Sequence, residues 1–296
     1  MLSKSIQLLA LLAALLPAVS AQGGLLIVQC GPLTIQRGDP IVSPGKISSH
    51  VHAVNAYYID RTCDYKEGRQ NCDNTQGAIA PPAGLRLVTG SPLRRTFDPS
   101  KFEDRAISHV CLDPGQDSVE ILQSPCAEMR TQTYFPSCWN RRDLDSADHK
   151  SHMAFPAIGD YNGGVCPESH PVATVSVFTE FFYNTRQVKD FNRWVYAEGD
   201  TIGYALHGDY LQGWTDQDRL ERAMATCTDP NGADDANCSL NVGPNGHPGE
   251  ITAQDPEQPA PAEEVGHNGK LDKLPGDNPV YYNLAIAMLA RLIILY

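Results

Sequence analysis

Residues 172–183 read VATVSVFTEFFY, and this run carries the strongest β-strand signal in the chain. Its β-branched and aromatic residues suit a pleated, buried surface, so we expect a central strand of a sheet. Glu180 sits within the run, where burial raises the pKa of a carboxyl group unless a cation pairs with it. A general acid or base is made in this way, so Glu180 is a candidate catalytic residue. A salt bridge, for instance to Arg193, is the alternative.

Further strands are expected on both sides of that run. They are predicted by alternation of apolar and polar residues, or by short β-branched runs between turn residues. The segments are 25–28, 84–95 (a strand and then a turn at 90–92), 106–112, the first part of 128–139, and 191–197. One helix is predicted over residues 216–226, where apolar residues fall at helical spacing after a capping box formed by Thr215 and Asp218. The sequence therefore predicts a mainly β fold: a single β-sandwich or jelly-roll-like domain with one short helix near residues 216–226.

The N-terminus has the pattern of a secretory signal. In residues 1–21, Lys4 precedes the apolar run 8–16, and small residues end at Ala21. The run is too short to cross a bilayer. We expect a secreted, extracellular protein with one β-rich domain over residues 22–280, in which 228–265 form a loop-rich arm.

The C-terminal tail, residues 281–296, is almost entirely apolar. One interpretation is a lipid-anchor signal, with small residues at Asn268 and Gly269 followed by a polar spacer. A transmembrane span is disfavoured, because the run is short and contains Arg291. The third interpretation is that the tail is a buried terminal strand, or that it is an artefact of how the coding sequence was assigned.

Composition limits the partners. The net charge is −12 and the isoelectric point is near 5.1, which argues against nucleic acid because nucleic-acid binding needs a basic face. The cysteines indicate disulfides rather than a metal site. The chain has nine cysteines and no CxxC pair, so a zinc ribbon is not indicated. In an exported protein, disulfides between near neighbours are expected, such as Cys63–Cys72, Cys111–Cys126 and Cys227–Cys238, with one cysteine left over. Asn237-Cys238-Ser239 matches the N-glycosylation acceptor sequence.

Three histidines are candidate metal ligands. His50 and His52 alternate along a predicted strand, so both imidazoles point to the same side and a third ligand would complete a site. His152 ends an acid-rich segment, residues 143–152, that suits a cation or a sugar hydroxyl. A solvated strand face and an Asp-rich turn that bonds its own backbone are the alternatives. No particular cofactor follows.

Residues 198–220 concentrate glycines, aromatic rings and polar groups, a composition typical of a ligand-site wall. His207 and Asp209 are candidate catalytic residues, while Asp200, Tyr204 and Trp214 are candidate substrate-binding residues. Arg86, predicted to point outward from its strand, joins them as a binding residue. The alternative is a tight corner whose polar side chains only bond the backbone.

Several ordered motifs resemble a family of secreted fungal proteins known only as a domain of unknown function. They are His50-Val51-His52, Ser137-Cys138-Trp139-Asn140, Asp148 to His152 (DHKSH), Cys166-Pro167 with Ser169-His170-Pro171, and His207-Gly208-Asp209-Tyr210 with Gly213-Trp214. The resemblance covers about residues 30–280 and implies one β-rich domain. In that family a long segment follows the His-Val-His motif, whereas here Val54-Asn55 runs directly into Ala56-Tyr57. The resemblance therefore implies that an internal block has been lost from this sequence, which would account for the odd cysteine count.

The polar residues of these motifs are far apart in sequence, so we expect them to converge on one cleft. The first hypothesis is a carbohydrate-active enzyme, of glycoside hydrolase or lyase type, acting on cell-wall or plant polysaccharide. In it, Glu180 and Asp209 act as acid and base or nucleophile, and Trp214 and Tyr204 stack on sugar rings. The second is a non-catalytic glycan-binding or wall-associated protein. The third is a metal-binding secreted protein that uses His50 and His52.

Overall fold

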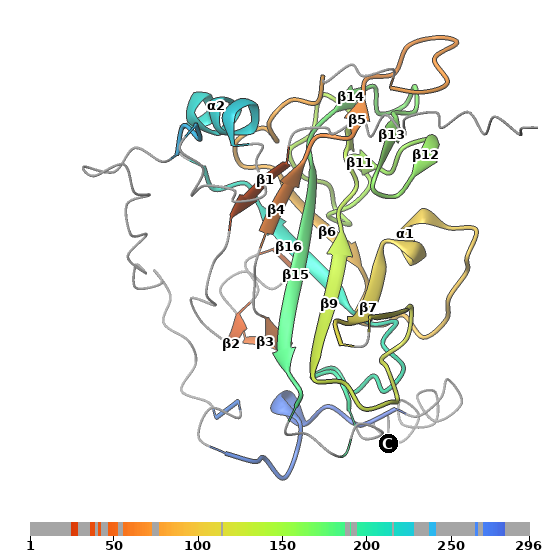
Figure 1. Ribbon diagram of the computed structural model, residues 1–296, viewed down its shortest axis with the longest axis vertical. Helices are drawn as coiled ribbons and strands as arrows, with labels where there is room; N and C mark the ends of the chain where they lie inside the picture. Colours follow the sequence, from red (N-terminus) through yellow and green to blue (C-terminus); the bar gives the residue numbers. More distant parts are fainter. Residues whose placement is uncertain are drawn as a thin grey trace, which may run out of the picture.

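The computed structural model describes residues 25–28, 36–38, 41–42, 47–52, 56–72, 77–113, 115–186, 190, 194–214, 216–227, 237–240, 264–265 and 269–281. For residues 25, 27–28, 36–38, 47–52 and 56 it describes only the backbone. The expected signal peptide (1–21), most of the arm (228–265) and the tail beyond residue 281 lie outside the described residues. Within them the protein is mainly β, as predicted (Figure 1).

The largest sheet has six strands, and each neighbouring pair is antiparallel. In spatial order they are β1 (Leu25–Val28), β4 (Ala56–Ile59), β15 (Ser176–Asn184), β9 (Glu128–Tyr134), β7 (Ile107–Cys111) and β8 (Gln116–Ser118). The predicted central strand is thus central, since β15 pairs with both β4 and β9. Its alternation places Val177 and Thr179 on one face of the sheet and Phe178 and Glu180 on the other.

A second layer covers one face of this sheet. It is the antiparallel pair β6 (Arg86–Gly90) and β16 (His207–Leu211), which runs behind β15 in Figure 1. Leu87 and Tyr210 are buried between the layers with Phe135 and Val177. Gly208 has no room for a side chain, because a Cβ atom there would lie 2.7 Å from Cζ of Phe135. The close approach of the two layers therefore depends on this glycine.

Smaller sheets complete the fold. One contains β11 (Met153–Ala154), β10 (Cys138–Trp139) and β14 (Val172–Ala173); another contains β12 (Ile158–Asp160), β13 (Gly163–Val165) and β5 (Thr62–Cys63); the third pairs β2 (Gln36–Gly38) with β3 (Ile47–His52). Only β13 with β5 is parallel among the strand pairs of the described segments. Residues 128–139 and residues 172–183 each contribute one strand to the six-stranded sheet and one to the β11–β10–β14 sheet.

Two strand predictions need correction. The run 172–183 is not one strand, because Val172–Ala173 pairs with β10 while the main-chain bonds at Thr174 and Val175 pass to Ser137 and Ile79. Residues 194–197 form no strand, because the Tyr196 N–H donates to the carbonyl of Asp200 and closes a local turn. Residues 191–193 lie outside the described residues.

The predicted helix is present as α2 (Gln217–Thr226), alongside the single short turn α1 (Phe102–Arg105) and the 3-10 turn η3 (Pro275–Asp277). Leu220 and Ala223 of α2 are fully buried and join the main core. The predicted capping box is wrong: the N-cap residue is Asp216, whose carboxylate accepts the N–H of Arg219. A carboxylate at this position also interacts favourably with the helix dipole.

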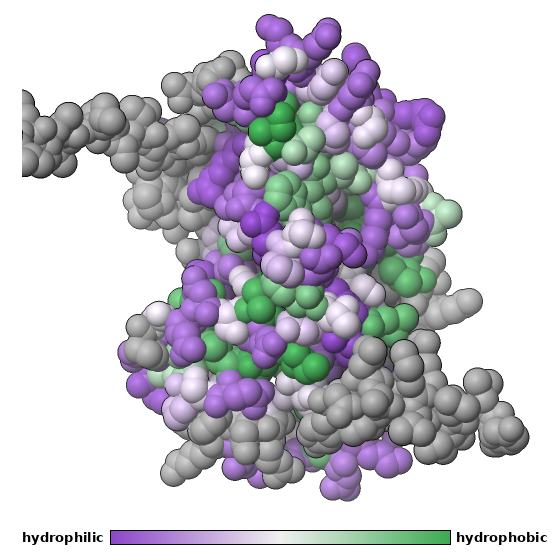
Figure 2. Space-filling model, turned by 90° about the vertical axis from the view of Figure 1, so that its right-hand side faces the viewer, coloured by the Kyte–Doolittle hydropathy of each residue, from purple (hydrophilic) through white to green (hydrophobic). Residues whose placement is uncertain are grey.

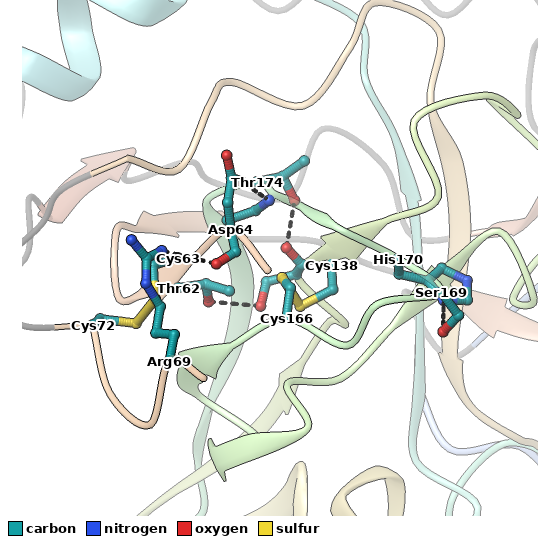
Figure 3. The surroundings of a disulfide bond; sticks show 12 residues. Thr62, Cys63, Asp64, Arg69, Cys72, Cys138, Cys166, Ser169, His170 and Thr174 are labelled. Atoms are coloured by element: carbon teal, nitrogen blue, oxygen red, sulfur yellow. Dashed lines mark hydrogen bonds between the residues drawn. A yellow bond between two sulfur atoms is a disulfide. The ribbon is translucent and has the colours of Figure 1, made fainter. Parts of the chain in front are cut away.

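Four disulfides brace the domain, and the three predicted pairs are all among them. The fourth joins Cys138 to Cys166 and lies near Cys63–Cys72 (Figure 3). Between these two bridges the Thr62 and Ser137 hydroxyls are 2.8 Å apart. Cys30, the ninth cysteine, lies outside the described residues. The Cys63–Cys72 and Cys138–Cys166 bridges thus hold segments of the two three-stranded sheets, whose strands are only two or three residues long.

The side of the molecule that carries α1, β12 and β13 is mostly hydrophilic, with apolar residues only in small patches (Figure 2). A broad apolar patch would indicate a protein or membrane interface. In the described part of the chain, no helix has the length and apolar character needed to cross a membrane.

Candidate functional site

The β6–β16 pair brings three of the predicted motif segments side by side. In its register Asp209 lies opposite Val88 and His207 lies opposite Gly90. On the other edge of β6, the Arg86 N–H donates to Leu144 O and the Val88 N–H to His149 O, both at 2.9 Å. The acid-rich loop, β6 and β16 therefore form one continuous strip of backbone.

Successive side chains of β6 and β16 point to opposite faces of the ladder. Leu87 and Tyr210 point inward to the core, so Arg86, His207 and Asp209 share the opposite side. We call this set the polar ladder face. Arg86 is exposed and His207 and Asp209 are half-buried, and both carboxylate oxygens of Asp209 are shielded from water. The sequence had proposed these three residues for one site. The structure places them on one side of the ladder, with Arg86 opposite Leu211 and His207 opposite Gly90, four positions apart along it.

The imidazole of His207 has a defined tautomer. Its Nδ1 lies 2.9 Å from the carbonyl oxygen of Ala205, which can only accept, so Nδ1 carries the proton. Nε2 is then the basic atom of the ring. A histidine held in this way can take up a proton or accept a hydrogen bond from a hydroxyl group.

The acid-rich loop beside β6, residues 143–152, is held in shape by hydrogen bonds to its own carboxylates. Asp148 accepts the N–H groups of Lys150 and Ser151 and the hydroxyls of Ser146 and Ser151. These hydrogen bonds, led by the Ser151 N–H, lower the pKa of Asp148. The carboxylate of Asp145 binds Nδ1 of His149 at 2.7 Å. The segment therefore has the self-bonded character of the Asp-rich turn alternative.

The predicted metal ligands are not seen to converge. His152 is 1% exposed, and its Nδ1 lies 2.8 Å from the Ser146 hydroxyl. Burial lowers the pKa of His152, so the ring is neutral at ordinary pH. The side chains of His50 and His52, on β3, lie outside what the structure describes. Among the side chains that are described, no group of three His, Cys, Asp or Glu residues could hold a metal ion.

Glu180 lies elsewhere. It is 6% exposed, on the face of the six-stranded sheet turned away from β6 and β16. Its Oε1 is 3.0 Å from the guanidinium of Arg130, on the neighbouring strand, and the Tyr57 hydroxyl also bonds to it. Burial and this bond raise the pKa of Tyr57. The salt-bridge alternative is thus realised with Arg130, while Arg193 lies outside the described residues.

The two candidate catalytic carboxylates do not meet. Glu180 and Asp209 point outward from opposite sides of two packed layers, and such layers stack about 10 Å apart before any side-chain length is added. Glycoside hydrolases need their carboxyl groups roughly 5 to 9.5 Å apart. The predicted pairing of Glu180 with Asp209 as acid and base is therefore not supported by the fold.

The remaining candidates make contacts within the fold, and their role in substrate binding stays a prediction. The Asp200 carboxylate is fully buried and accepts the N–H groups of Ile202, Gly203 and Ala205, which holds the turn of residues 200–205. The indole N–H of Trp214 donates to the Tyr58 hydroxyl at 3.0 Å. The ring of Tyr204 stacks on Phe97, with centroids 5.9 Å apart. Burial and a hydrogen bond to Glu120 raise the pKa of Tyr204 to about 12.

Two features escaped the sequence analysis. One is a row of aromatic rings on the outer face of the six-stranded sheet, whose members come from four separate segments. The other is a buried pair in which Nε2 of His109 lies 2.7 Å from the Tyr196 hydroxyl. Burial lowers the pKa of His109 to about 4. The only sequence signal for the pair was that His109 lies two residues from Ile107 and two from Cys111 in a predicted strand, and so shares their side of the sheet.

The fold and the site define a class: a disulfide-braced, mainly β protein with a polar face on a two-stranded ladder. Over residues 54–214, more than half of the chain, the sequence matches the family described as Domain of unknown function (DUF1996). The chain belongs to this family, in agreement with the resemblance to a domain of unknown function. The matched range includes the whole polar ladder face but begins beyond His52. No curated protein and no solved structure matches the chain.

Proposed function

We propose that this is a secreted protein that binds cell-wall or plant polysaccharide, with the polar ladder face as its binding surface. The observation that carries the proposal is the register of β6 with β16, which puts Arg86, His207 and Asp209 on one side of a rigid ladder. Rigid strands position binding groups more accurately than loops. The chemistry of these groups fits hydroxylated rings.

The guanidinium group of Arg86 donates hydrogen bonds and Nε2 of His207 accepts them, so the face can bind one sugar hydroxyl as an acceptor and another as a donor. The edge of the face adds the Asp145–His149 pair and Lys150, whose ammonium group also binds the carbonyl of Gly90. Bonds to charged groups are stronger than neutral ones, which suits recognition at a surface in contact with water.

An extracellular location is supported by the four disulfides, which persist in oxidising compartments. The signal-like pattern of residues 1–21 points the same way. Asn237, the predicted glycosylation residue, is exposed, although the neighbouring Cys238 is bonded to Cys227. Its modification and a lipid anchor at the tail stay predictions.

Binding without hydrolysis is favoured over glycoside hydrolysis, because Glu180 and Asp209 face away from each other. One observation favours a second candidate, a polysaccharide lyase: the tautomer of His207 makes Nε2 a proton acceptor. In that reaction Nε2 would remove the C5 proton of a uronate while Arg86 binds its carboxylate. The C4–O bond breaks, a C4=C5 double bond forms, and the departing oxygen takes up a proton from water, or the same proton back from His207.

The test is Arg86→Ala, a change at an exposed side chain. Loss of one charge-assisted bond should weaken glycan binding roughly tenfold. Binding to soluble β-glucan, chitin oligosaccharides and polyuronates would be measured by calorimetry. Arg219→Ala, on the exposed side of α2, is the matched control and should bind normally. Unchanged binding in Arg86→Ala would refute the polar ladder face. An unsaturated, ultraviolet-absorbing product from a polyuronate, lost in His207→Gln, would establish the lyase.

A further inference from the structure

The outer face of the six-stranded sheet carries a second set of polar and aromatic side chains. Alternation along β9 places Arg130, Gln132 and Tyr134 there, each partly exposed, while Thr131 and Thr133 between them are buried. Phe178 and Glu180 of β15 share this side. We call the face, with Tyr57 of β4 and Ser108 of β7, the sheet outer face. The β6–β16 layer packs against the other side.

Four rings form a continuous row across the sheet outer face. The centroids of Tyr57 and Phe178 are 5.5 Å apart, those of Phe178 and Tyr134 are 4.0 Å apart, and those of Tyr134 and Tyr161 are 5.2 Å apart. Tyr57, Tyr134 and Tyr161 are partly exposed. Their π faces attract the C–H groups that line the apolar face of a pyranose ring.

Beside the rings lies a cluster of polar side chains in which some polar atoms are hydrogen-bonded and others are not. Arg130 pairs with Glu180 at 3.0 Å, and the Gln132 amide donates to the Ser108 hydroxyl at 2.7 Å. Yet Nε of Arg130 and Oε1 of Gln132 are shielded from water and have no hydrogen-bond partner in the structure. Whichever way the amide is turned, Ser108 satisfies only one of its two polar atoms.

Unsatisfied buried polar atoms are rare in native proteins, and each calls for an explanation. Here one donor and one acceptor stand two residues apart on the same side of β9. Both side chains are partly exposed, so a small shift of each would bring these atoms to the surface, where one sugar hydroxyl would accept from Nε and an adjacent one would donate to Oε1. Neighbouring rings and paired polar atoms together fit a sugar better than a purely apolar or purely ionic ligand.

We infer that the sheet outer face is a second glycan-binding site, which takes a hexose unit of a neutral polysaccharide. Tyr161 stacks on the sugar ring, Tyr134 flanks it at 63° to the Tyr161 ring, and Arg130 and Gln132 bind its hydroxyls. This site goes beyond the polar ladder face and does not depend on it. Because the two faces point in opposite directions, one molecule holding both ligands bridges two glycan chains.

The decisive variant is Gln132→Met, which keeps the shape of the side chain and removes both of its polar atoms. If Gln132 serves the ligand, the variant weakens binding of laminarin, cellohexaose or chitohexaose roughly fivefold, while its melting temperature equals or exceeds that of the unchanged protein. If Gln132 serves only the fold, the melting temperature falls and affinity is retained. The latter result overturns the inference.

Tyr161→Ala is the second variant, and loss of one stacking ring should also weaken binding several-fold. Tyr65→Ala is its matched control, since Tyr65 is 36% exposed on the Cys63–Cys72 loop and lies outside the aromatic row. Equal affinity of Tyr161→Ala and Tyr65→Ala for all three probes would contradict the site, as would an absence of binding by the unchanged protein.

The same titrations separate the two sites. In an Arg86→Ala background, the binding that remains should respond to Gln132→Met. If Arg86→Ala abolishes all binding and the sheet variants have no effect, the second site fails and the proposed function stands. If only the sheet variants matter, the polar ladder face fails and the second site stands.

Discussion

Replacing His109 by glutamine should flatten the pH dependence of stability of this protein in acid. The His109 ring is fully buried, and its Nε2 contacts the Tyr196 hydroxyl at 2.7 Å. A Cβ atom on Gly203 would lie 2.7 Å from its Cε1, so the ring fills its space tightly. Glutamine keeps a group able to bond Tyr196 but cannot titrate.

The size of the effect follows from the pKa. Burial lowers the pKa of His109 from 6.5 to about 4, against the opposing charge of Asp200. Between those values the unfolded chain binds a proton that the folded chain does not, so stability falls as the pH falls. At 1.36 kcal/mol per pH unit, the loss between pH 7 and pH 4 is about 3 kcal/mol. Below about pH 4 both states are protonated and His109 adds no further loss.

The assay is urea unfolding followed by tryptophan fluorescence at pH 7, 6, 5 and 4. His109→Gln should lose about 3 kcal/mol less than the unchanged protein across this range, whatever its stability at pH 7. His170→Gln, at a partly exposed histidine, is the control and should keep the original slope. If His109→Gln also keeps that slope, a neutral buried His109 is not the cause.

Three further changes test the fold that holds the sites. Asp200→Asn, which replaces an oxygen facing backbone N–H groups by an amide, should cost about 2 to 3 kcal/mol and lower the melting temperature; a melting temperature unchanged from the original protein would show that the turn does not need the carboxylate. Gly208→Ala should cost about 1 to 3 kcal/mol in urea unfolding, because its new methyl group meets Phe135 at 2.7 Å, and an equally stable variant would mean that the two layers separate easily. Removing the Cys138–Cys166 bridge with alanine at both positions should cost about 3 to 4 kcal/mol, since the bridge closes a segment 28 residues long, whereas unchanged stability would show that the small sheets do not rely on it.

Local patterns predicted much of the fold. The strand at Leu25–Val28 and the helix at Gln217–Thr226 agree with the structure to within a residue or two, because alternation and helical spacing are properties of neighbouring residues. The short-range disulfides were predictable for a similar reason, since few residues separate their cysteines. The N-cap was misplaced by one position, because Thr215 and Asp216 both suit it by type.

The candidate site was predicted only in part. Arg86, His207 and Asp209 share one face because a single strand pairing joins their segments. Glu180 was grouped with them, but its strand presents it to the far side of the other sheet. Because side chains alternate with a period of two, one residue more or less in a strand exchanges the two faces. The residue types indicated which side chains could form a site, but the face to which each side chain points follows only from the register of the strand pairs.

By itself, the sequence determined that this chain forms a disulfide-braced, mainly β protein, because strand periodicity, helical spacing and close cysteines act over short distances. The order of its motifs along the chain places it in the DUF1996 family. Only the tertiary structure decided that Arg130 is the partner of Glu180 and that four rings from separate segments form a row. It also decided that Asp200 is a buried turn anchor rather than an open surface group. Such contacts join residues far apart in the chain, and they depend on which strands pair and in which register.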